Sequence, residues 1–195
     1  MLSDINTQYY NTNSLNNLRN GNINADLSIF HLNAQSLAGK FDEINVQLKQ
    51  IKNKFDIICF TESWLNTNIK DIYNLDGYKA YHCLRELGNR GGGISVYVHE
   101  RIKAEVIYTT SLPHIEALFL KITTGRKHTI IGTLYRPPIC NSDDFTNSLL
   151  SILNNLQVMK SNTETILTGD FNLDVLKSDN HIGMSISLTH YLQCI

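Results

Sequence analysis

The stretch TILTGDFNLD, residues 165–174, joins a short apolar run to an acid, an aromatic residue and an amide. The first four residues are predicted to form a buried strand, which leads into the group GDFN at 169–172. On an extended backbone, residues two positions apart point the same way, so Asp170 and Asn172 would share one face. A strand that only had to end would not need this pair, and the stretch therefore predicts a functional site.

Length and composition favour a single globular domain. The chain has 195 residues, of which 42% are hydrophobic and 18% are charged, and such values suit a domain with its own buried core. The formal net charge of -1 excludes a strong overall positive field. An enzyme that acts on DNA would therefore need a local basic patch.

The cysteines and the hydropathy pattern indicate the compartment. The four scattered cysteines form no C-x-x-C pair and have no zinc-binding spacing, which indicates reduced thiols. No apolar run reaches membrane length, and the N-terminus does not resemble a signal peptide. We therefore expect an intracellular protein, nuclear or cytoplasmic, that is not secreted and has no membrane partner.

Residues 1–25 differ in composition from the rest of the chain. Asparagine accounts for eight of the nineteen residues from Asn6 to Asn24. So little apolar surface cannot offset the entropy that ordering costs. We expect a weakly ordered arm at 1–25, followed by one folded domain over 26–195.

The folded domain alternates predicted strands and helices. Apolar residues in 41–54 recur at helical spacing between strands at 27–32 and 56–60, which predicts a crossover between parallel neighbours. Further helices are expected at 143–158 and 186–195. The remaining apolar or alternating runs predict strands, mostly in antiparallel hairpins, at 78–84, 94–98, 104–108, 115–122, 128–135 and 165–168. An α/β fold of two sheets packed face to face, with helices outside, would bury all these faces.

Polar residues follow the strongest strands: Asn33, Glu62, Tyr135, and then Asp170 with Asn172. Polar groups gathered at one edge of a sheet are how α/β folds build sites. This oxygen-rich set suits Mg²⁺ or Mn²⁺. A tyrosine hydroxyl and an asparagine amide can donate to a charged phosphate oxygen, and an aspartate can activate water. The set therefore predicts metal-assisted hydrolysis of a phosphate ester.

Each of these residues also has a plain structural interpretation. Alone, Glu62 would be a capping or surface acid, and Asn33 a turn residue. Tyr135 would be a packed aromatic residue at a strand edge, and the segment 170–172 an Asx-turn. The catalytic interpretation rests on the conjunction, because four strand ends with compatible chemistry are unexpected by chance.

These segments resemble the endonuclease/exonuclease/phosphatase superfamily. The resemblance is carried by HLNAQSL, FTESWL, RGGGISVYV, IEALFLKI, LYRPP and GDFNLDVL, and it covers roughly 27–195. The order and wording of these segments in the sequence are similar to those of the endonuclease domain of jockey-like and related LINE-type non-LTR retrotransposons. The resemblance implies a four-layer α/β sandwich and a Mg²⁺-dependent endonuclease, with Mn²⁺ as an alternative ion. Such an enzyme nicks DNA to prime reverse transcription, and in a full-length element it accompanies a reverse-transcriptase domain.

The resemblance also implies a role for each site residue. Glu62 would be the main metal-binding carboxylate, and Asn33 would help to hold the metal or the phosphate. Tyr135 would donate a hydrogen bond to the scissile phosphate. Asp170 would orient or activate the attacking water, and Asn172 would stabilise the charge that develops on the phosphate.

Four further residues are candidates near the site. Glu116 in IEALFLKI matches a supporting position of the family. Arg90 and Arg136 are candidate contacts to the DNA phosphate backbone, and Arg85 is a weaker one, since a solvated surface position explains it as well. The run RGGG at 90–93 precedes a strand and no helix, so we expect a turn and no phosphate-binding loop.

The sequence departs from the family pattern in two places. Gln35 stands where some relatives carry a metal-binding acid, which favours the retrotransposon branch. The family also ends in a late Asp and a Ser-Asp-His motif that supplies the catalytic histidine. The sequence 178–181, SDNH, follows Asn172 too closely to be that motif, so His181 is not expected to be catalytic. We expect a C-terminally truncated domain that lacks its last strands and its catalytic His and Asp.

Two other functions stay open from the sequence. A phosphatase of the same fold would act on a phosphoinositide or another small phosphate ester. A catalytically inactive remnant would only bind DNA or a protein, and the absent histidine favours this alternative.

Overall fold

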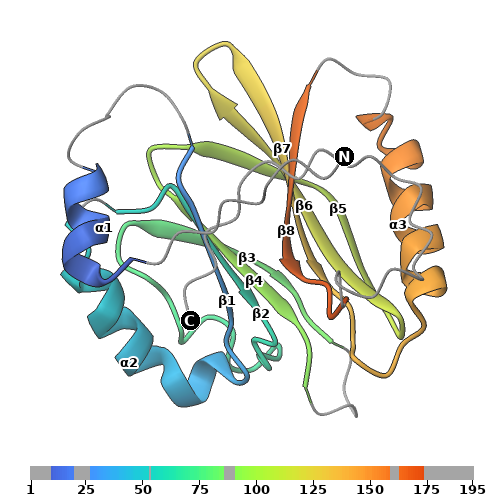
Figure 1. Ribbon diagram of the computed structural model, residues 1–195, viewed down its shortest axis with the longest axis horizontal. Coiled ribbons are helices and arrows are strands. Elements are labelled where there is room, and N and C mark those ends of the chain that lie inside the picture. The colour runs from blue at the N-terminus through green and yellow to red at the C-terminus, as the bar shows by residue number, and fades with distance from the viewer. Residues whose placement is uncertain (1–9, 20–26, 53, 86–90, 159–162, 174–195) are drawn as a thin grey trace.

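The computed structural model describes residues 10–19, 27–52, 54–85, 91–158 and 163–173. Two four-stranded sheets pack face to face between helices (Figure 1). The first sheet contains, in spatial order, β1 (Ile29–Asn33), β2 (Ile57–Thr61), β4 (Ile94–His99) and β3 (Tyr78–Cys83). The second contains β5 (Lys103–Leu112), β6 (Ile115–Thr124), β7 (Lys127–Tyr135) and β8 (Glu164–Asp170). The helices are α1 (Thr12–Arg19), α2 (Leu37–Gln50) and α3 (Ser142–Asn155).

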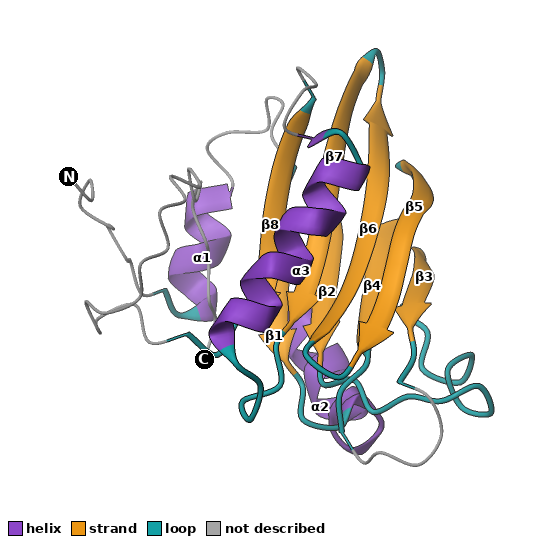
Figure 2. Ribbon diagram, turned by 90° about the vertical axis from the view of Figure 1, so that its right-hand side faces the viewer, coloured by secondary structure: helices purple, strands orange, loops and turns teal. Residues whose placement is uncertain are grey.

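The sheets and helices form four layers. Helices α1 and α2 lie outside the first sheet, and α3 lies across the outer face of the second (Figures 1 and 2). Strand β1 is parallel to β2 and β7 is parallel to β8, whereas the other strand pairs are antiparallel. Each parallel pair is joined through a helix, as a crossover requires. The predicted α/β fold of two mixed, largely antiparallel sheets with outer helices is confirmed.

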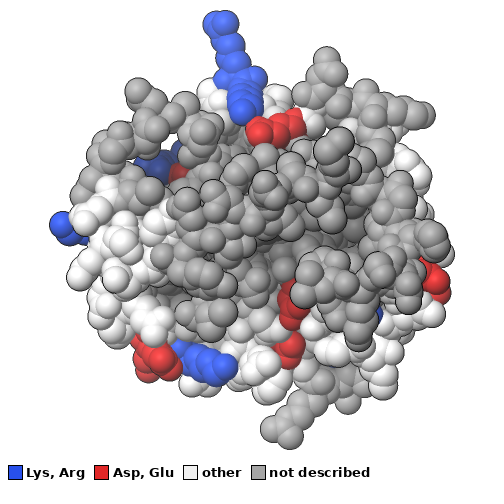
Figure 3. All heavy atoms as spheres, viewed as in Figure 1, with Lys and Arg blue, Asp and Glu red and all other residues white. Residues whose placement is uncertain are grey.

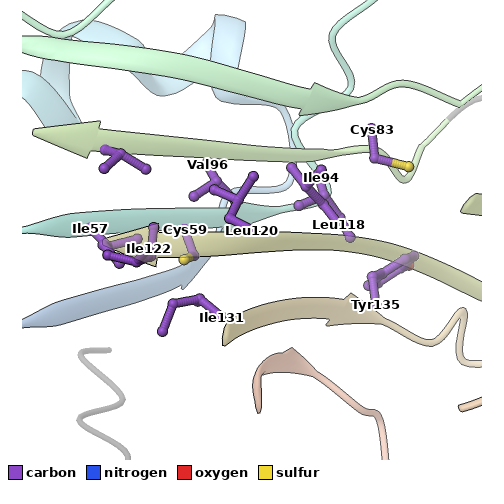
Figure 4. Packing of buried hydrophobic residues seen from close by; sticks show 11 residues of the cluster. Ile57, Cys59, Cys83, Ile94, Val96, Leu118, Leu120, Ile122, Ile131 and Tyr135 are labelled. Atoms are coloured by element: carbon purple, nitrogen blue, oxygen red, sulfur yellow. The ribbon is translucent and has the colours of Figure 1, made fainter. Parts of the chain in front are cut away.

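The main core lies between the two sheets. Side chains from β2 and β4 meet those from β6 and β7 in one apolar cluster (Figure 4). Two further clusters fill the space under α1 and α2 and the space under α3. All five residues of β2 are buried, because this strand has a packed layer on both faces. A central strand of this kind needs a continuous apolar run, and residues 57–60 provide it.

The helices begin earlier than the apolar spacing predicts. Helix α2 starts at Leu37, because the Ser36 hydroxyl accepts a hydrogen bond from the Gly39 N–H at 3.3 Å and caps its first turn. Helix α3 starts at Ser142 after Asn141, whose side chain accepts from the Asp143 N–H at 2.7 Å. Helix starts are therefore set by the capping residues, which lie outside the apolar stripe.

Part of the segment 1–25, for which we expect a weakly ordered arm, forms α1 and contacts the end of α2. Leu15 of α1 is buried in the cluster under the helices. The Asn16 side chain donates to the Gln50 carbonyl at 3.1 Å and accepts from the Lys52 N–H at 2.8 Å. Those groups lie at the C-terminal end of α2, where backbone groups lack helical partners. One leucine and one asparagine therefore hold α1 in place despite its polar composition.

Some sequence-based expectations fall on other parts of the chain. The predicted helix at 186–195, the sequence SDNH at 178–181 and Arg90 lie outside the described residues. Within the described ranges, no helix is long and apolar enough to cross a membrane. Cys59, Cys83 and Cys140 are free thiols.

Asp56 fastens the start of β2 at the end of the sheet. Its carboxylate accepts hydrogen bonds from the Ser28 N–H and hydroxyl, both at 2.8 Å, and pairs with Arg101. Burial by itself raises the pKa of Asp56, but the bonds from Arg101 and Ser28 outweigh it and leave the pKa below its ordinary value of 3.8. The native state therefore favours the charged form.

We expect Asp56→Asn to lower the free energy of unfolding at neutral pH by about 1–3 kcal/mol, because a charged acceptor of several bonds is lost. A lowered pKa stabilises the fold above 3.8, and this contribution disappears as the pH falls through the native pKa. Urea unfolding of both proteins at neutral and acidic pH should show the difference shrinking in acid. A difference that does not change with pH would contradict this role of the charge.

Candidate active site

Both sheets end at the same edge of the molecule, and the candidate residues lie there. In the first sheet, Asn33 is the register partner of Thr61, directly before Glu62. In the second sheet, Tyr135 is the partner of both Glu116 and Asp170. Strands β1 and β8 lie close together (Figure 1). The topology thus brings residues from distant parts of the sequence to one place.

Asn33 joins the two carboxylates of the site. Its Nδ2 donates to Glu62 Oε1 at 2.8 Å and to Asp170 Oδ2 at 2.6 Å. The second bond crosses from one sheet to the other. Two carboxylates with a shared donor are held at a fixed separation, which a flexible pair of acids would not keep.

Tyr135 is buried beside Glu62. Burial raises the pKa of the Tyr135 hydroxyl above its usual value, and the charge of Glu62 and a hydrogen bond to it act in the same direction. The hydroxyl therefore stays protonated at neutral pH. A protonated hydroxyl at the edge of the site can act as a hydrogen-bond donor.

Asn172 and Asp170 fix one another after β8. The Asn172 N–H donates to Asp170 Oδ1 at 3.2 Å, and the Asn172 side chain donates to the Arg136 carbonyl at 2.8 Å. Both oxygens of Asp170 are therefore oriented, one by Asn33 and one by Asn172. The bond from the Asn172 N–H to the Asp170 side chain is an Asx-turn, the plain structural interpretation of this segment. A catalytic role of Asp170 and Asn172 stays a prediction.

Arg136 is buried under this turn. Its guanidinium donates to the Phe171 carbonyl at 2.7 Å and to the carbonyls of Asn172 and Cys140. All three nitrogens are thus used within the protein, in a role that differs from the phosphate contact expected from the sequence. A planar guanidinium can serve three carbonyls at once, which an ammonium cannot.

We expect Arg136→Lys to lower the free energy of unfolding by about 2–3 kcal/mol, because three carbonyls lose charge-assisted hydrogen bonds from a buried guanidinium. Arg126→Lys, at an exposed position in the turn after β6, is the matched control and should change it very little. Urea unfolding of the three proteins measures the effect. Equal midpoints for both variants would show that Arg136 does not support the turn.

Glu116 lies under the site as a supporting residue. It is fully buried, and it accepts hydrogen bonds from Arg85 Nε at 2.5 Å and from the Gly93 N–H at 2.6 Å. Burial raises the pKa of Glu116, and Arg85 and Gly93 act against this. The Arg85 guanidinium also lies over the Tyr135 ring, 5.9 Å from its centre. The sequence placed Arg85 near the site, but its pairing with Glu116 was not foreseen.

His31 is the histidine of β1, the strand that ends at Asn33. Burial lowers its pKa to about 4, although the Asp170 carboxylate acts in the opposite direction. Its Nε2 lies 3.2 Å from the Thr61 hydroxyl. The imidazole is therefore neutral at neutral pH and carries no positive charge into the site.

Strained backbone positions gather around the site. Five non-glycine residues with positive φ belong to the loops of this edge: Gln35, Ser36, Glu62, Trp64 and Asn172, with φ of 43°, 84°, 51°, 55° and 47°. Side chains other than glycine rarely adopt this conformation, which typically costs about 1–2 kcal/mol each. Such strain clusters where side chains must be held for function.

The residues present fit a divalent cation. Among the described residues, no ion pair joins Glu62 or Asp170 to a Lys or Arg. Within the described ranges, no cluster of three His, Cys, Asp or Glu side chains could hold a metal by itself. Mg²⁺ needs only one or two carboxylates and keeps several waters. The donor set therefore suits a divalent cation that accepts oxygen ligands and keeps part of its water shell.

Comparisons with known proteins agree with this architecture. The family model described as Endonuclease/Exonuclease/phosphatase matches residues 9–190. Among curated proteins, no sequence matches the chain. Solved structures with the same fold include humanized D. rerio TDP2, with TM-score 0.57 and 16% identity over 76% of this chain and 63% of that one.

Two other solved structures are of interest. A mannosyl-6-phosphatase of Bacteroides thetaiotaomicron has TM-score 0.54 and 16% identity, over 76% of this chain and 66% of that one. The endonuclease domain of TRAS1, a telomere-specific non-LTR retrotransposon, has TM-score 0.54 and 14% identity, over 76% and 62%.

The chain spans about 63% of the length of the first of these structures, and at such identities the likeness concerns the fold alone. The family model, in contrast, matches nearly the whole sequence, and the chain therefore belongs to the endonuclease/exonuclease/phosphatase family.

Proposed function

We propose that this protein is a Mg²⁺-dependent phosphodiesterase that nicks DNA. The observation that carries the proposal is the Asn33 amide, which holds Glu62 and Asp170 on one nitrogen across the two sheets. Tyr135 and Asn172 adjoin the same carboxylates. This is the arrangement of donors and acceptors that hydrolysis of a phosphate ester requires.

Glu62 and Asn33 would hold the cation. Glu62 carries a charge that no described Lys or Arg pairs with, and a carboxylate oxygen is a preferred ligand of Mg²⁺. When bound, the cation supplies positive charge next to the phosphoryl oxygens. Mn²⁺ accepts the same oxygen ligands and is the alternative ion.

The other three residues would act on the phosphate and the water. Asp170, with both oxygens oriented, accepts a hydrogen bond from the attacking water and can take its proton. The Tyr135 hydroxyl has a single hydrogen, which is directed at Glu62 in the structure, and it would turn this hydrogen to a phosphate oxygen when Glu62 holds the cation. Asn172 uses one amide hydrogen on the Arg136 carbonyl, and its second hydrogen is a donor for the developing negative charge.

The proposed biological role is target-site nicking for a non-LTR retrotransposon. It is supported by the motifs of the sequence and by the shared fold of the TRAS1 endonuclease domain. A D. rerio TDP2 structure is described as a complex with a single-strand DNA product, so a relative in fold accepts DNA. In this role the domain would work inside the cell, together with a reverse-transcriptase domain.

Relaxation of a supercoiled plasmid tests the proposal. The 195-residue chain should convert supercoiled to nicked plasmid with Mg²⁺, stop when the metal is chelated, and recover when Mg²⁺ or Mn²⁺ is restored. Hydrolysis of a small phosphate monoester without nicking would instead favour a phosphatase, the activity named for one relative in fold. A folded protein with neither activity would sink the proposal and leave the inactive remnant.

A further inference from the structure

Trp64 is an exposed aromatic residue directly beside the candidate active site. It lies two positions after Glu62, and 36% of its surface is accessible. Single apolar residues at a surface are ordinary and need no explanation. Trp64, however, also has a positive φ of 55°, which is an outlier for a bulky side chain. The strain gives a reason to ask what this position does.

The backbone that carries Trp64 is fixed on two sides. The N–H groups of Ser63 and Trp64 donate to the carbonyls of Gly93 and Gly92, at 3.1 and 2.9 Å. On the other side, the carbonyls of Glu62 and Ser63 accept from the N–H groups of Ser36 and Leu37, at 3.0 and 2.9 Å. Four backbone bonds therefore hold the segment 62–64, and Trp64 keeps a set position relative to Glu62.

The glycine run lies against the indole and makes room for the neighbouring Arg85. A Cβ added to Gly91 would lie 3.5 Å from Trp64 Nε1 and 3.9 Å from an Arg85 nitrogen, so both side chains lie against this backbone. A Cβ at Gly92 would lie 2.2 Å from the centre of the Arg85 guanidinium. Arg85 in turn pairs with Glu116 and lies over Tyr135. Arg85 therefore lies between the glycine run, which contacts Trp64, and Tyr135 of the candidate site.

The charge of the protein gives no reason to expect strong binding of nucleic acid through phosphate contacts alone. The formal net charge is -1, and on the face seen in Figure 3 the described acidic and basic side chains are interspersed, without a continuous basic band. Phosphate contacts alone would give weak binding that salt readily reduces. Stacking of bases on aromatic side chains adds affinity that does not depend on a positive surface.

We propose that Trp64 is the stacking platform for a nucleobase next to the phosphate that the site cleaves. This inference rests on the proposed function, because it takes nucleic acid as the substrate class. The ring of any base can stack on an indole, so the platform would accept many sequences. An unstacked base is required, which favours single-stranded or locally opened DNA over a regular duplex.

Fluorescence of the protein tests the platform directly, because Trp64 is the one tryptophan in the sequence. An oligothymidylate of about 12 nucleotides is titrated without added divalent metal, and an abasic oligonucleotide of equal length and charge is the control. The oligothymidylate should quench the tryptophan emission, and the abasic strand should not. Equal quenching by both strands would overturn the proposal.

Binding of the same labelled oligonucleotides, followed by anisotropy, gives the second readout. Trp64→Ala should weaken binding of oligothymidylate by roughly ten- to a hundredfold, and Trp64→Phe should restore much of it. Val46→Ala removes an exposed apolar side chain of α2 and serves as the matched control. Binding that is unchanged in Trp64→Ala, or no binding by the parent protein, would overturn the platform.

These readouts separate the two proposals. Nicking by a protein whose tryptophan does not respond to bases would remove the platform and keep the proposed function. Base-dependent quenching without nicking under any metal would keep the platform as a binding site and remove the catalytic function.

Discussion

Asp170→Ala is expected to slow plasmid nicking by about 10²–10⁴-fold, the range typical of the loss of a positioned general base. The carboxylate is oriented by Asn33 and by the Asn172 N–H, so water cannot easily take over its geometry. Glu62→Gln should cause a comparable loss, because an amide keeps the shape but is a poor ligand for Mg²⁺. Initial rates of plasmid relaxation at saturating Mg²⁺ measure both effects.

The control for this experiment is Asp144→Ala, which removes an exposed acid from the first turn of α3. It changes the net charge as Asp170→Ala does and should leave the nicking rate unaltered. Raised Mg²⁺ should partly restore Glu62→Gln and should not restore Asp170→Ala, since only the first change concerns the metal. If Asp170→Ala nicks like the parent, the water-activating role assigned to it is wrong.

Gly169→Ala is expected to lower the free energy of unfolding by more than about 3 kcal/mol. A Cβ at this position would lie 1.9 Å from the Leu134 carbonyl oxygen, and its φ of 142° belongs to a region that glycine alone adopts readily. The obstacle is backbone, so no side chain can move aside. The close contact between the backbones of Gly169 and Leu134 also places Tyr135 beside Asp170. The fraction of Gly169→Ala that still folds should therefore also nick poorly.

Gly125→Ala separates the clash from the backbone conformation. Gly125 also has a positive φ, 61°, but a Cβ there would meet nothing within 4 Å. We expect a cost of about 1 kcal/mol for this variant. Urea unfolding of the two variants and the parent gives the comparison. Similar costs at both positions would show that the close approach at Gly169 is readily relieved.

The position of the candidate residues could be predicted from the sequence because they lie at or directly after strand ends. Asn33 and Glu62 end neighbouring parallel strands, and so do Tyr135 and Asp170. In such pairs the residues after the strands meet at one edge, so the order of apolar runs already places them. The resemblance named the same residues, and the structure brings all of them together.

Other features depend on contacts between segments that lie far apart in the sequence, and no local pattern predicts such contacts. An asparagine-rich segment predicts disorder, but in α1 Leu15 is buried and Asn16 bonds to the end of another helix. Arg136 could be a surface cation by its position in the sequence, but in the structure it donates to the carbonyls of Cys140, Phe171 and Asn172. The sequence pattern does not single out Trp64, because an aromatic residue in a loop gives no periodic signal.

The two sheets are built from successive halves of the chain, since residues 29–99 supply the first sheet and residues 103–170 supply the second. The bond from Asn33 to Asp170 therefore links two folding halves, and the site exists only while they are docked. Activity should disappear in step with the docking of the sheets, before either sheet loses its own strand pairing. The proposed nicking activity would thus report on the cooperativity of this domain, and substitutions deep in the shared core should affect it at a distance.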